Sequence, residues 1–280
     1  IQAAIKNADI SFIDLHKFYD EFGINDNLHF TTSVSGTLND FTTNNLKLVS
    51  DRNAIIKGDL NFKNVFNLEK GFVLNGNLKN LTSDYENLKI LLPNLLGKTL
   101  PSSFEKLGRF KIIGDTYITE NLISAQLTME TDLGTTITDL ELTNISNIDE
   151  ASYIGNVKIV DFELGKVIKD SLVGKLSMEA EVDGKGFTLE SMNTSVNGII
   201  SKHQYKGYTY NNMSINGIVK SKRFEGDFEV NDDNIKLNFN GLADLSAETY
   251  SFDFKTVVDY CDLNSINLFI RDSISNIRGD

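Results

Sequence analysis

Apolar and polar residues alternate along most of this 280-residue chain. Near residue 60, for example, Leu60 and Phe62 fall on one parity, and Asp59, Asn61 and Lys63 fall on the other. The same two-residue period returns at residues 72–78, 123–129, 157–159, 176–182, 213–215, 235–239 and 250–254. A period of two puts alternate side chains on opposite faces of a strand. The pattern therefore predicts antiparallel strands with one apolar face and one polar face.

Turn-forming residues interrupt the alternating runs. Asn-Gly and Asp-Gly pairs favour tight hairpin turns because both residue types tolerate positive φ. We expect turns at Asn75-Gly76, Asp183-Gly184, Asn197-Gly198, Asn240-Gly241 and Asn231-Asp232-Asp233-Asn234. Short connections of this kind predict a meander in which each strand pairs with the next one along the chain.

Helical signals are few and short. Capping residues followed by spaced apolar residues predict helices near 14–22, 84–92 and 102–107. Each falls where an alternating run pauses, so we expect these helices to be lids on the apolar face or caps at an end of the sheet.

A larger unit recurs within the chain. Residues 153–187 contain an alternating strand, a helical turn from Asp161 to Lys169, and a second alternating strand. A weaker copy runs from Tyr250 to Leu268. Such recurrence predicts an elongated sheet of repeated strand units rather than an enzyme pocket. The best candidate joint, 144–152, divides the chain into segments 1–150 and 151–280, which we expect to form one continuous elongated unit.

Composition and charge exclude some classes of partner. The chain carries 27 Lys and Arg against 39 Asp and Glu, a net charge of −12. Such an acidic chain lacks the basic surface needed to bind nucleic acid or an anionic membrane. The single Cys261 excludes an internal disulfide. No apolar run reaches the ~20 residues of a membrane-spanning helix. Because the chain opens at Ile1 without Met, we interpret it as a piece of a larger protein whose anchor lies elsewhere.

Residue patterns that carry chemistry are missing. The three histidines, His16, His29 and His203, have no metal-binding spacing, and no nucleophile motif occurs. Glu179 and Glu181 alternate with apolar neighbours and are expected on the solvated face of a strand. We therefore expect no enzyme activity, no cofactor and no metal.

The apolar parity is the candidate functional surface. Two arrangements fit it: a closed core packed against a second sheet, or a curved sheet whose inner face stays open as a groove. The alternation cannot distinguish them, because both need the same pattern. The candidate groove-lining residues are Leu60, Phe62, Phe72, Leu74, Leu127, Val157, Ile159, Leu176, Met178, Val182, Met213, Ile215, Ile235, Leu237, Phe239, Tyr250, Phe252 and Phe254.

Several short segments resemble a known family. Residues 160–166 (VDFELGK), 172–176 (LVGKL) and 182–187 (VDGKGF), followed by 205–212, 224–226 and 237–244, are similar to the repeated unit of TamB-like translocation and assembly module proteins, within the AsmA-like group. The resemblance covers most of the chain and is best after residue 153.

The resemblance implies a mainly β fold, a taco-like groove, in the periplasmic part of a protein anchored in the inner membrane of a Gram-negative cell. It implies an apolar groove that carries phospholipid acyl chains between the inner and outer membranes, with no catalytic residues. An alternative is a scaffold for outer-membrane protein assembly or secretion beside an Omp85-type barrel, which would be contacted through parts outside this chain. A purely structural β-repeat with a closed apolar face is the third possibility.

Overall fold

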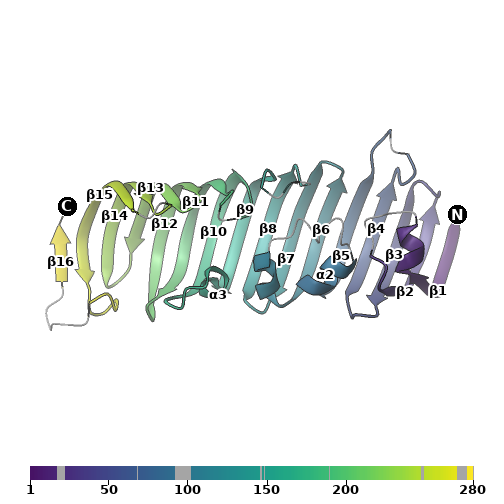
Figure 1. Cartoon of the computed structure of the whole chain (residues 1–280), viewed down its shortest axis with the longest axis horizontal. Coiled ribbons are helices and arrows are strands. Elements are labelled where there is room, and N and C mark those ends of the chain that lie inside the picture. The colour runs from purple at the N-terminus through teal and green to yellow at the C-terminus, as the bar shows by residue number, and fades with distance from the viewer. Residues whose placement is uncertain are drawn as a thin grey trace. The chain divides into compact units, whose positions relative to one another are not determined.

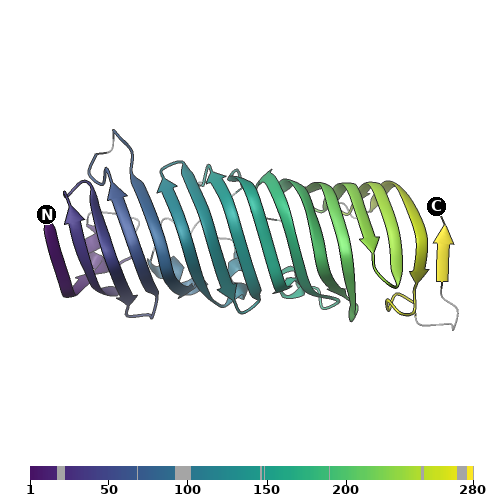
Figure 2. The same cartoon turned by 180° about the vertical axis from the view of Figure 1, so that it is seen from behind.

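Antiparallel β-structure dominates the fold (Figures 1 and 2). The computed structural model describes residues 1–17, 23–67, 69–91, 102–145, 147, 149–188, 190–246, 249–269 and 276–279. Their strands form one open antiparallel sheet whose strand order follows the chain order. Three short helices, α1 (Phe12–His16), α2 (Tyr85–Leu91) and α3 (Leu164–Ile168), and the 3₁₀ helix η1 (Ser102–Leu107) accompany the described strands. The predicted mainly β, antiparallel fold with few short helices is confirmed.

Internal packing divides the chain into two compact units. Unit 1 consists of Ile1–Asp132 and Ile137–Ile148, and unit 2 consists of Leu133–Thr136 and Asp149–Asp280. The boundary between the units at 148–149 falls within residues 144–152, the boundary segment predicted from the sequence. One continuous elongated body stays a prediction.

Unit 1 holds the first eight strands, except for the first residues of β8. They are β1 (Gln2–Ser11), β2 (Asn27–Gly36), β3 (Phe41–Ser50), β4 (Ile55–Lys63), β5 (Val73–Asp84), β6 (Arg109–Thr119), β7 (Leu122–Thr131) and β8 (Gly134–Thr143). Unit 2 holds β9 (Ser152–Glu163), β10 (Val173–Lys185), β11 (Asn193–Tyr205), β12 (Tyr208–Lys220), β13 (Arg223–Asn231), β14 (Ile235–Asp244), β15 (Ser251–Asp262) and β16 (Asn276–Gly279).

Strand register assigns every side chain to one of two faces. Residues that pair across neighbouring strands share a face. Phe62 pairs with Phe41 and Leu74, and Phe239 pairs with Phe228. We call the face that carries these residues the apolar face. The intervening positions, such as Asp59 opposite Asn77, form the polar face.

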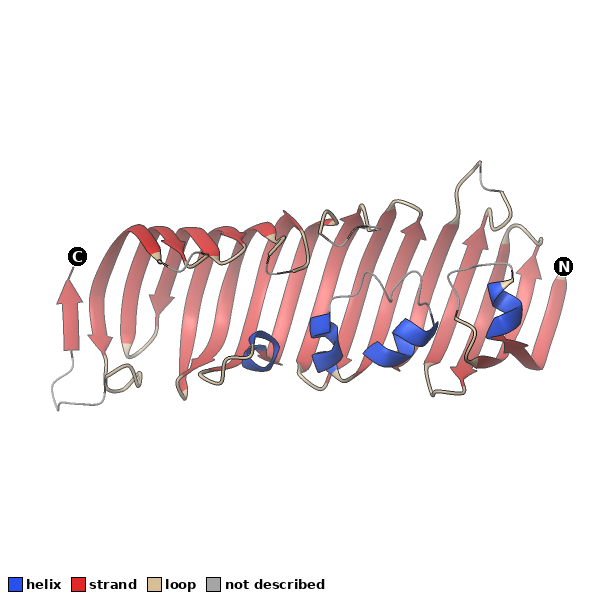
Figure 3. Ribbon diagram, viewed as in Figure 1, coloured by secondary structure: helices blue, strands red, loops and turns tan. Residues whose placement is uncertain are grey.

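The two ends of the strands differ. Because successive strands are antiparallel, the connections after odd-numbered strands in each unit lie at one end of that unit, which we call its helix end. In unit 1 this end carries α1 after β1, and α2 and η1 between β5 and β6; in unit 2 it carries α3 after β9 (Figure 3). Connections after even-numbered strands lie at the opposite end, the hairpin end. Within unit 1, the helices lie on a single face of the sheet (Figure 3).

The buried core gathers at the helix end of the apolar face. In unit 1, Phe12 of α1 is 1 % exposed, and Leu28, Leu46 and Phe110 of the strands are also buried. In unit 2 the buried cluster is Met213, Val230, Ile235, Cys261 and Ile266. Helices and turns cover the apolar face at this end, where they remove apolar surface from water. At the hairpin end of unit 2, the connection after β10 also covers part of this face, with Phe187 against Tyr153 and Ala151 1 % exposed.

Four of the expected turns are wrong. Asn75-Gly76, Asp183-Gly184, Asn197-Gly198 and Asn240-Gly241 all lie inside strands, and of the expected set only 231–234 connects two strands. The glycines stand on the apolar face, where a neighbouring strand approaches closely, through its backbone at Gly184, Gly198 and Gly241 and through side chains at Gly76. At Gly76 an added Cβ would lie 3.2 Å from Leu60. Here glycine marks crowding and bending within a strand instead of a turn.

The helices are shorter than expected or shifted. α1 begins at Phe12 instead of residue 14 and is described only to His16, and residues 18–22 lie outside the described residues. α2 lies within the range predicted at 84–92, and 102–107 is a 3₁₀ helix. The turn expected to begin at Asp161 begins instead at Leu164, because Asp161 has φ of 49° and forms a bulge in β9. The weaker copy after β15 is a turn rather than a helix.

Candidate functional site

The predicted groove-lining residues share one face. Sixteen of the eighteen lie in strands on the apolar face, and Phe72 and Tyr250 immediately precede β5 and β15. Five of the eighteen belong to unit 1: Leu60, Phe62, Phe72, Leu74 and Leu127. The other thirteen belong to unit 2, so each unit presents its own apolar surface.

These residues fall into two groups that differ in how much of each side chain is buried. Met213 and Ile235 are buried in the cluster at the helix end, and Leu237 packs against that cluster. At the hairpin end, by contrast, Phe252 and Phe254 remain 55 % and 48 % exposed. The open-face and closed-core arrangements thus coexist on the same strands, one at each end.

In unit 1 the uncovered part contains three phenylalanines, which we call the Phe41 row. The rings of Phe41 and Phe62 stack with their centroids 4.8 Å apart, and Phe72 lies 6.4 Å from Phe62. All three are half-buried. Their positions at the hairpin ends of β3, β4 and β5 put them away from α1 and α2.

In unit 2 a second set, which we call the Phe224 row, crosses β13, β14 and β15. Phe239 lies 6.1 Å from Phe224 and 4.9 Å from Phe254, and Phe252 lies 6.0 Å from Phe254. Covering one such side chain completely is worth about 1.5–3 kcal/mol. The row therefore forms a preformed apolar surface. Binding an apolar partner there would remove apolar area from water and so be favourable.

Sequence reasoning missed two members of these rows, Phe41 and Phe224. Both follow the strand parity of their neighbours, so a stricter use of the alternation would have found them. Their contacts were not accessible from sequence, because the register that pairs Phe41 with Phe62 depends on the turn at 51–54 and on the register shift between Thr43 and Leu46.

Burial at the covered end shifts the pKa of three titratable groups. Burial raises the pKa of Tyr210 to about 12 and also raises the pKa of the Cys261 thiol. Burial lowers the pKa of His203, and its Nδ1 has no hydrogen-bond partner. All three groups are held in their neutral forms, as expected where apolar side chains exclude water.

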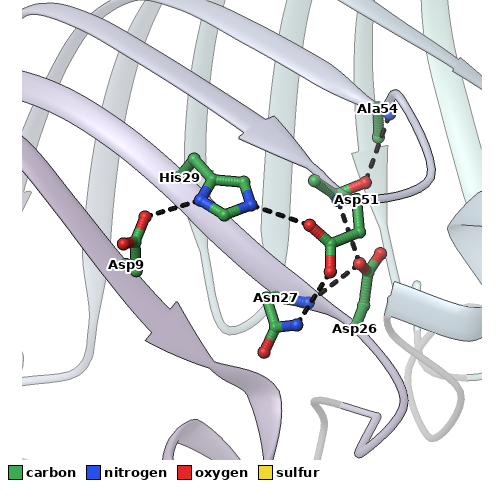
Figure 4. A network of polar contacts seen from close by, with 7 residues as sticks. Asp9, Asp26, Asn27, His29, Asp51 and Ala54 are labelled. Atoms are coloured by element: carbon green, nitrogen blue, oxygen red, sulfur yellow. Dashed lines mark hydrogen bonds and ion pairs between the residues drawn. The ribbon is translucent and has the colours of Figure 1, made fainter.

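A polar network joins the first three strands at the helix end of the polar face (Figure 4). The His29 imidazole lies between two carboxylates, with Nδ1 2.5 Å from Asp9 Oδ1 and Nε2 2.7 Å from Asp51 Oδ1. These hydrogen bonds, first with Asp9 and then with Asp51, raise the pKa of His29. Asn27 donates to Asp51, and Asp26 accepts the backbone N–H of Asp51, so the network also orders the turn after β3.

The polar face is hollowed in several places. One hollow of about 450 Å³ lies over β3–β7, and another of about 670 Å³ lies over β9–β11. Most of the residues that line them belong to the polar parity, so these hollows are separate from the two phenylalanine rows.

Among the described residues, no group of three or more His, Cys, Asp or Glu side chains is placed to hold a metal ion. In that same part of the chain, none of the helices has the length and apolar character needed to cross a bilayer.

Comparisons with known proteins found no match: no protein-family model, no curated protein and no solved structure is significantly similar to this chain. The two faces of the sheet are therefore the features from which we infer a function.

Proposed function

We propose that the uncovered part of the apolar face binds lipid acyl chains. The observation that carries this proposal is the half-exposed Phe224 row, with Phe252 and Phe254 at 55 % and 48 % exposure beside a buried cluster on the same strands. An acyl chain needs apolar contact and no hydrogen bonds, and each CH₂ that it buries is worth about 0.8 kcal/mol. The aromatic and aliphatic lining supplies this contact.

This chemistry agrees with the resemblance to TamB-like proteins of the AsmA-like group. The protein would then be a periplasmic segment of an inner-membrane-anchored protein in a Gram-negative cell. It would carry phospholipid between the inner and outer membranes without acting as an enzyme. An Omp85-type barrel would be reached through parts outside this chain.

One observation supports the alternative role as a scaffold for protein assembly. Among the described residues, β16 pairs with β15 only at Val258, Cys261 and Asp262. The part of β15 before Val258 is thus an edge with which another strand can pair. An extended client segment would pair with such an edge through its backbone.

Native mass spectrometry with lipid extraction tests the lipid proposal. The chain is purified from a Gram-negative host as wild type, as Phe254→Asp, and as the control Ile218→Asp. Phe254 and Ile218 are 48 % and 49 % exposed, but Ile218 lies on the polar face. A charge at either site should leave the fold intact, which thermal unfolding checks.

We expect phospholipid on the wild type and on Ile218→Asp, and at least a tenfold loss on Phe254→Asp. Lipid-free wild-type protein would contradict the proposal, as would an equal loss in both folded variants. If Thr256→Pro abolished the binding of protein clients but left lipid bound, the result would favour the scaffold role.

A further inference from the structure

The hollow over β3–β7 has an ordered lining. Strand register places five side chains of the polar face in one line across the sheet: Thr42, Asn61, Asn75, Tyr117 and Ser124. All five line the hollow, which we call the Asn75 hollow. Adjacent strands lie about 4.8 Å apart, so the line extends over roughly 19 Å.

The lining is polar, and one of its two carboxylates has a cationic partner. Of its two carboxylates, Asp59 accepts from Lys79 Nζ at 2.7 Å and from the Asn45 backbone at 2.6 Å. Asp115 accepts from Asn77 Nδ2 at 2.7 Å. Among the described residues, no Lys or Arg lines the hollow. In contrast, the hollow over β9–β11 contains charged pairs such as Lys158 and Glu179.

Several groups in the line still have hydrogen-bonding capacity. Within the described part of the chain, the side chains of Asn75 and Ser124 and the Tyr117 hydroxyl make no hydrogen bond. Asn61 uses one N–H to donate to Thr42 Oγ1 at 2.8 Å, and its carbonyl oxygen stays available. Tyr117 is 38 % exposed and presents an aromatic surface beside these groups.

We propose that the Asn75 hollow binds an uncharged oligosaccharide laid across strands β3–β7. Carboxamides and hydroxyls both donate and accept, as sugar hydroxyls require. The apolar side of a sugar ring stacks on an aromatic face such as that of Tyr117, and waters fill the remaining gaps in an open site. An anionic ligand would need cationic partners, and an acyl chain would need an apolar lining. This inference is independent of lipid binding on the opposite face.

The test uses the full chain, with ¹⁵N chemical-shift perturbation by neutral hexasaccharides. The panel is maltohexaose, cellohexaose, xylohexaose and chitohexaose, each titrated to millimolar concentration. The variants are Asn75→Ala, Tyr117→Ala and the milder Tyr117→Leu, which keeps apolar bulk. Asn238→Ala is the matched control, because Asn238 lines a different hollow on the polar face of unit 2. Thermal unfolding confirms that each variant is folded.

We expect at least one hexasaccharide to shift amides of β4, β5 and β6. Its affinity should fall at least tenfold in Asn75→Ala and in both Tyr117 variants, and should be unchanged in Asn238→Ala. The proposal is overturned if no member of the panel binds. It is also overturned if binding survives the Asn75 and Tyr117 substitutions, or if an extended peptide displaces the sugar and binds more tightly.

Discussion

At the scale of the residue, single backbone positions decide how the strands bend. Gly226 in β13 has φ of +154°, a conformation that side-chain-bearing residues rarely adopt. A Cβ added there would lie 2.3 Å from the Asn216 carbonyl oxygen and 2.5 Å from Gly217 Cα. Gly226 pairs with Gly217 and Gly241, so three strands approach without side chains next to the Phe224 row.

Gly226→Ala should therefore destabilise unit 2 by about 1–3 kcal/mol, because it adds backbone strain and a steric clash. Urea unfolding followed by circular dichroism measures the change. Gly279→Ala is the control, because a Cβ there meets nothing within 4 Å. Equal stability of the two variants would show that the bend at Gly226 is not required.

Protonation of His29 should strengthen the attachment of β1. Asp9 faces Nδ1 and Asp51 faces Nε2, and only the imidazolium donates to both carboxylates. The pKa of His29 is raised above 6.5 in the folded state. This stabilisation is fully present below pH 6.5 and is lost as the pH rises through the folded-state pKa. The pKa of Asp51 is lowered from 3.8, first by Asn27 and then by His29, so a second loss occurs as the pH falls through that lowered value.

An NMR titration of the His29 ring, with amide exchange of β1 as a second readout, checks the prediction. Asp9→Asn should bring the pKa of His29 closer to 6.5 and weaken the pH dependence of β1 protection. A wild-type His29 that titrates below 6.5 would contradict the described network.

At the scale of the element, short turns cover the core, since the described residues form a single sheet with no second sheet packed on it. Ile266, in the turn after β15, is 0 % exposed and packs with Met213, Val230 and Cys261. Asp232 stabilises the turn at 231–234, which connects β13 to β14. Burial alone would raise the pKa of Asp232, but hydrogen bonds from Tyr208, Asn234 and Asn211 lower it. These turns act as covers for the helix end of the apolar face.

Ile266→Ala should cost about 2–5 kcal/mol, because it leaves a cavity in a closed cluster. Phe254→Ala should cost much less although it removes more atoms, because that ring is already half exposed. Urea unfolding of both variants gives the comparison. If Phe254→Ala costs as much as Ile266→Ala, the hairpin end is closed in solution and the lipid proposal loses its basis.

At the scale of the whole molecule, the chain combines strong negative charge with uncovered apolar surface. The net charge of −12 keeps copies of the chain apart. The Phe41 row in unit 1 is half-buried, and the Phe224 row in unit 2 includes the exposed Phe252 and Phe254. Contiguous exposed apolar surface is typical of binding sites in soluble proteins.

The native chain should bind an apolar dye such as ANS without unfolding. Phe62→Asp should remove the part of the signal that comes from unit 1, and Phe254→Asp the part that comes from unit 2. Because each row lies within its own unit, the two losses should add in the double variant. Fluorescence titration after delipidation measures the signal, and a native wild-type chain that binds no dye would refute the prediction.

The sequence by itself determined the strands and their two faces, because a period of two is a local property of extended backbone. Parity placed Phe62, Met213 and Phe254 correctly on one face, although Asn-Gly pairs within strands were mistaken for turns. Only the tertiary structure decided that Met213 is closed over and Phe254 is open. That difference depends on where Ile266 and the helices at the helix end pack, and such contacts between distant segments leave no periodic trace in the sequence. The alignment of Asn61, Asn75 and Tyr117 on the opposite face likewise depends on strand register, which is set by turns and bulges across the whole sheet.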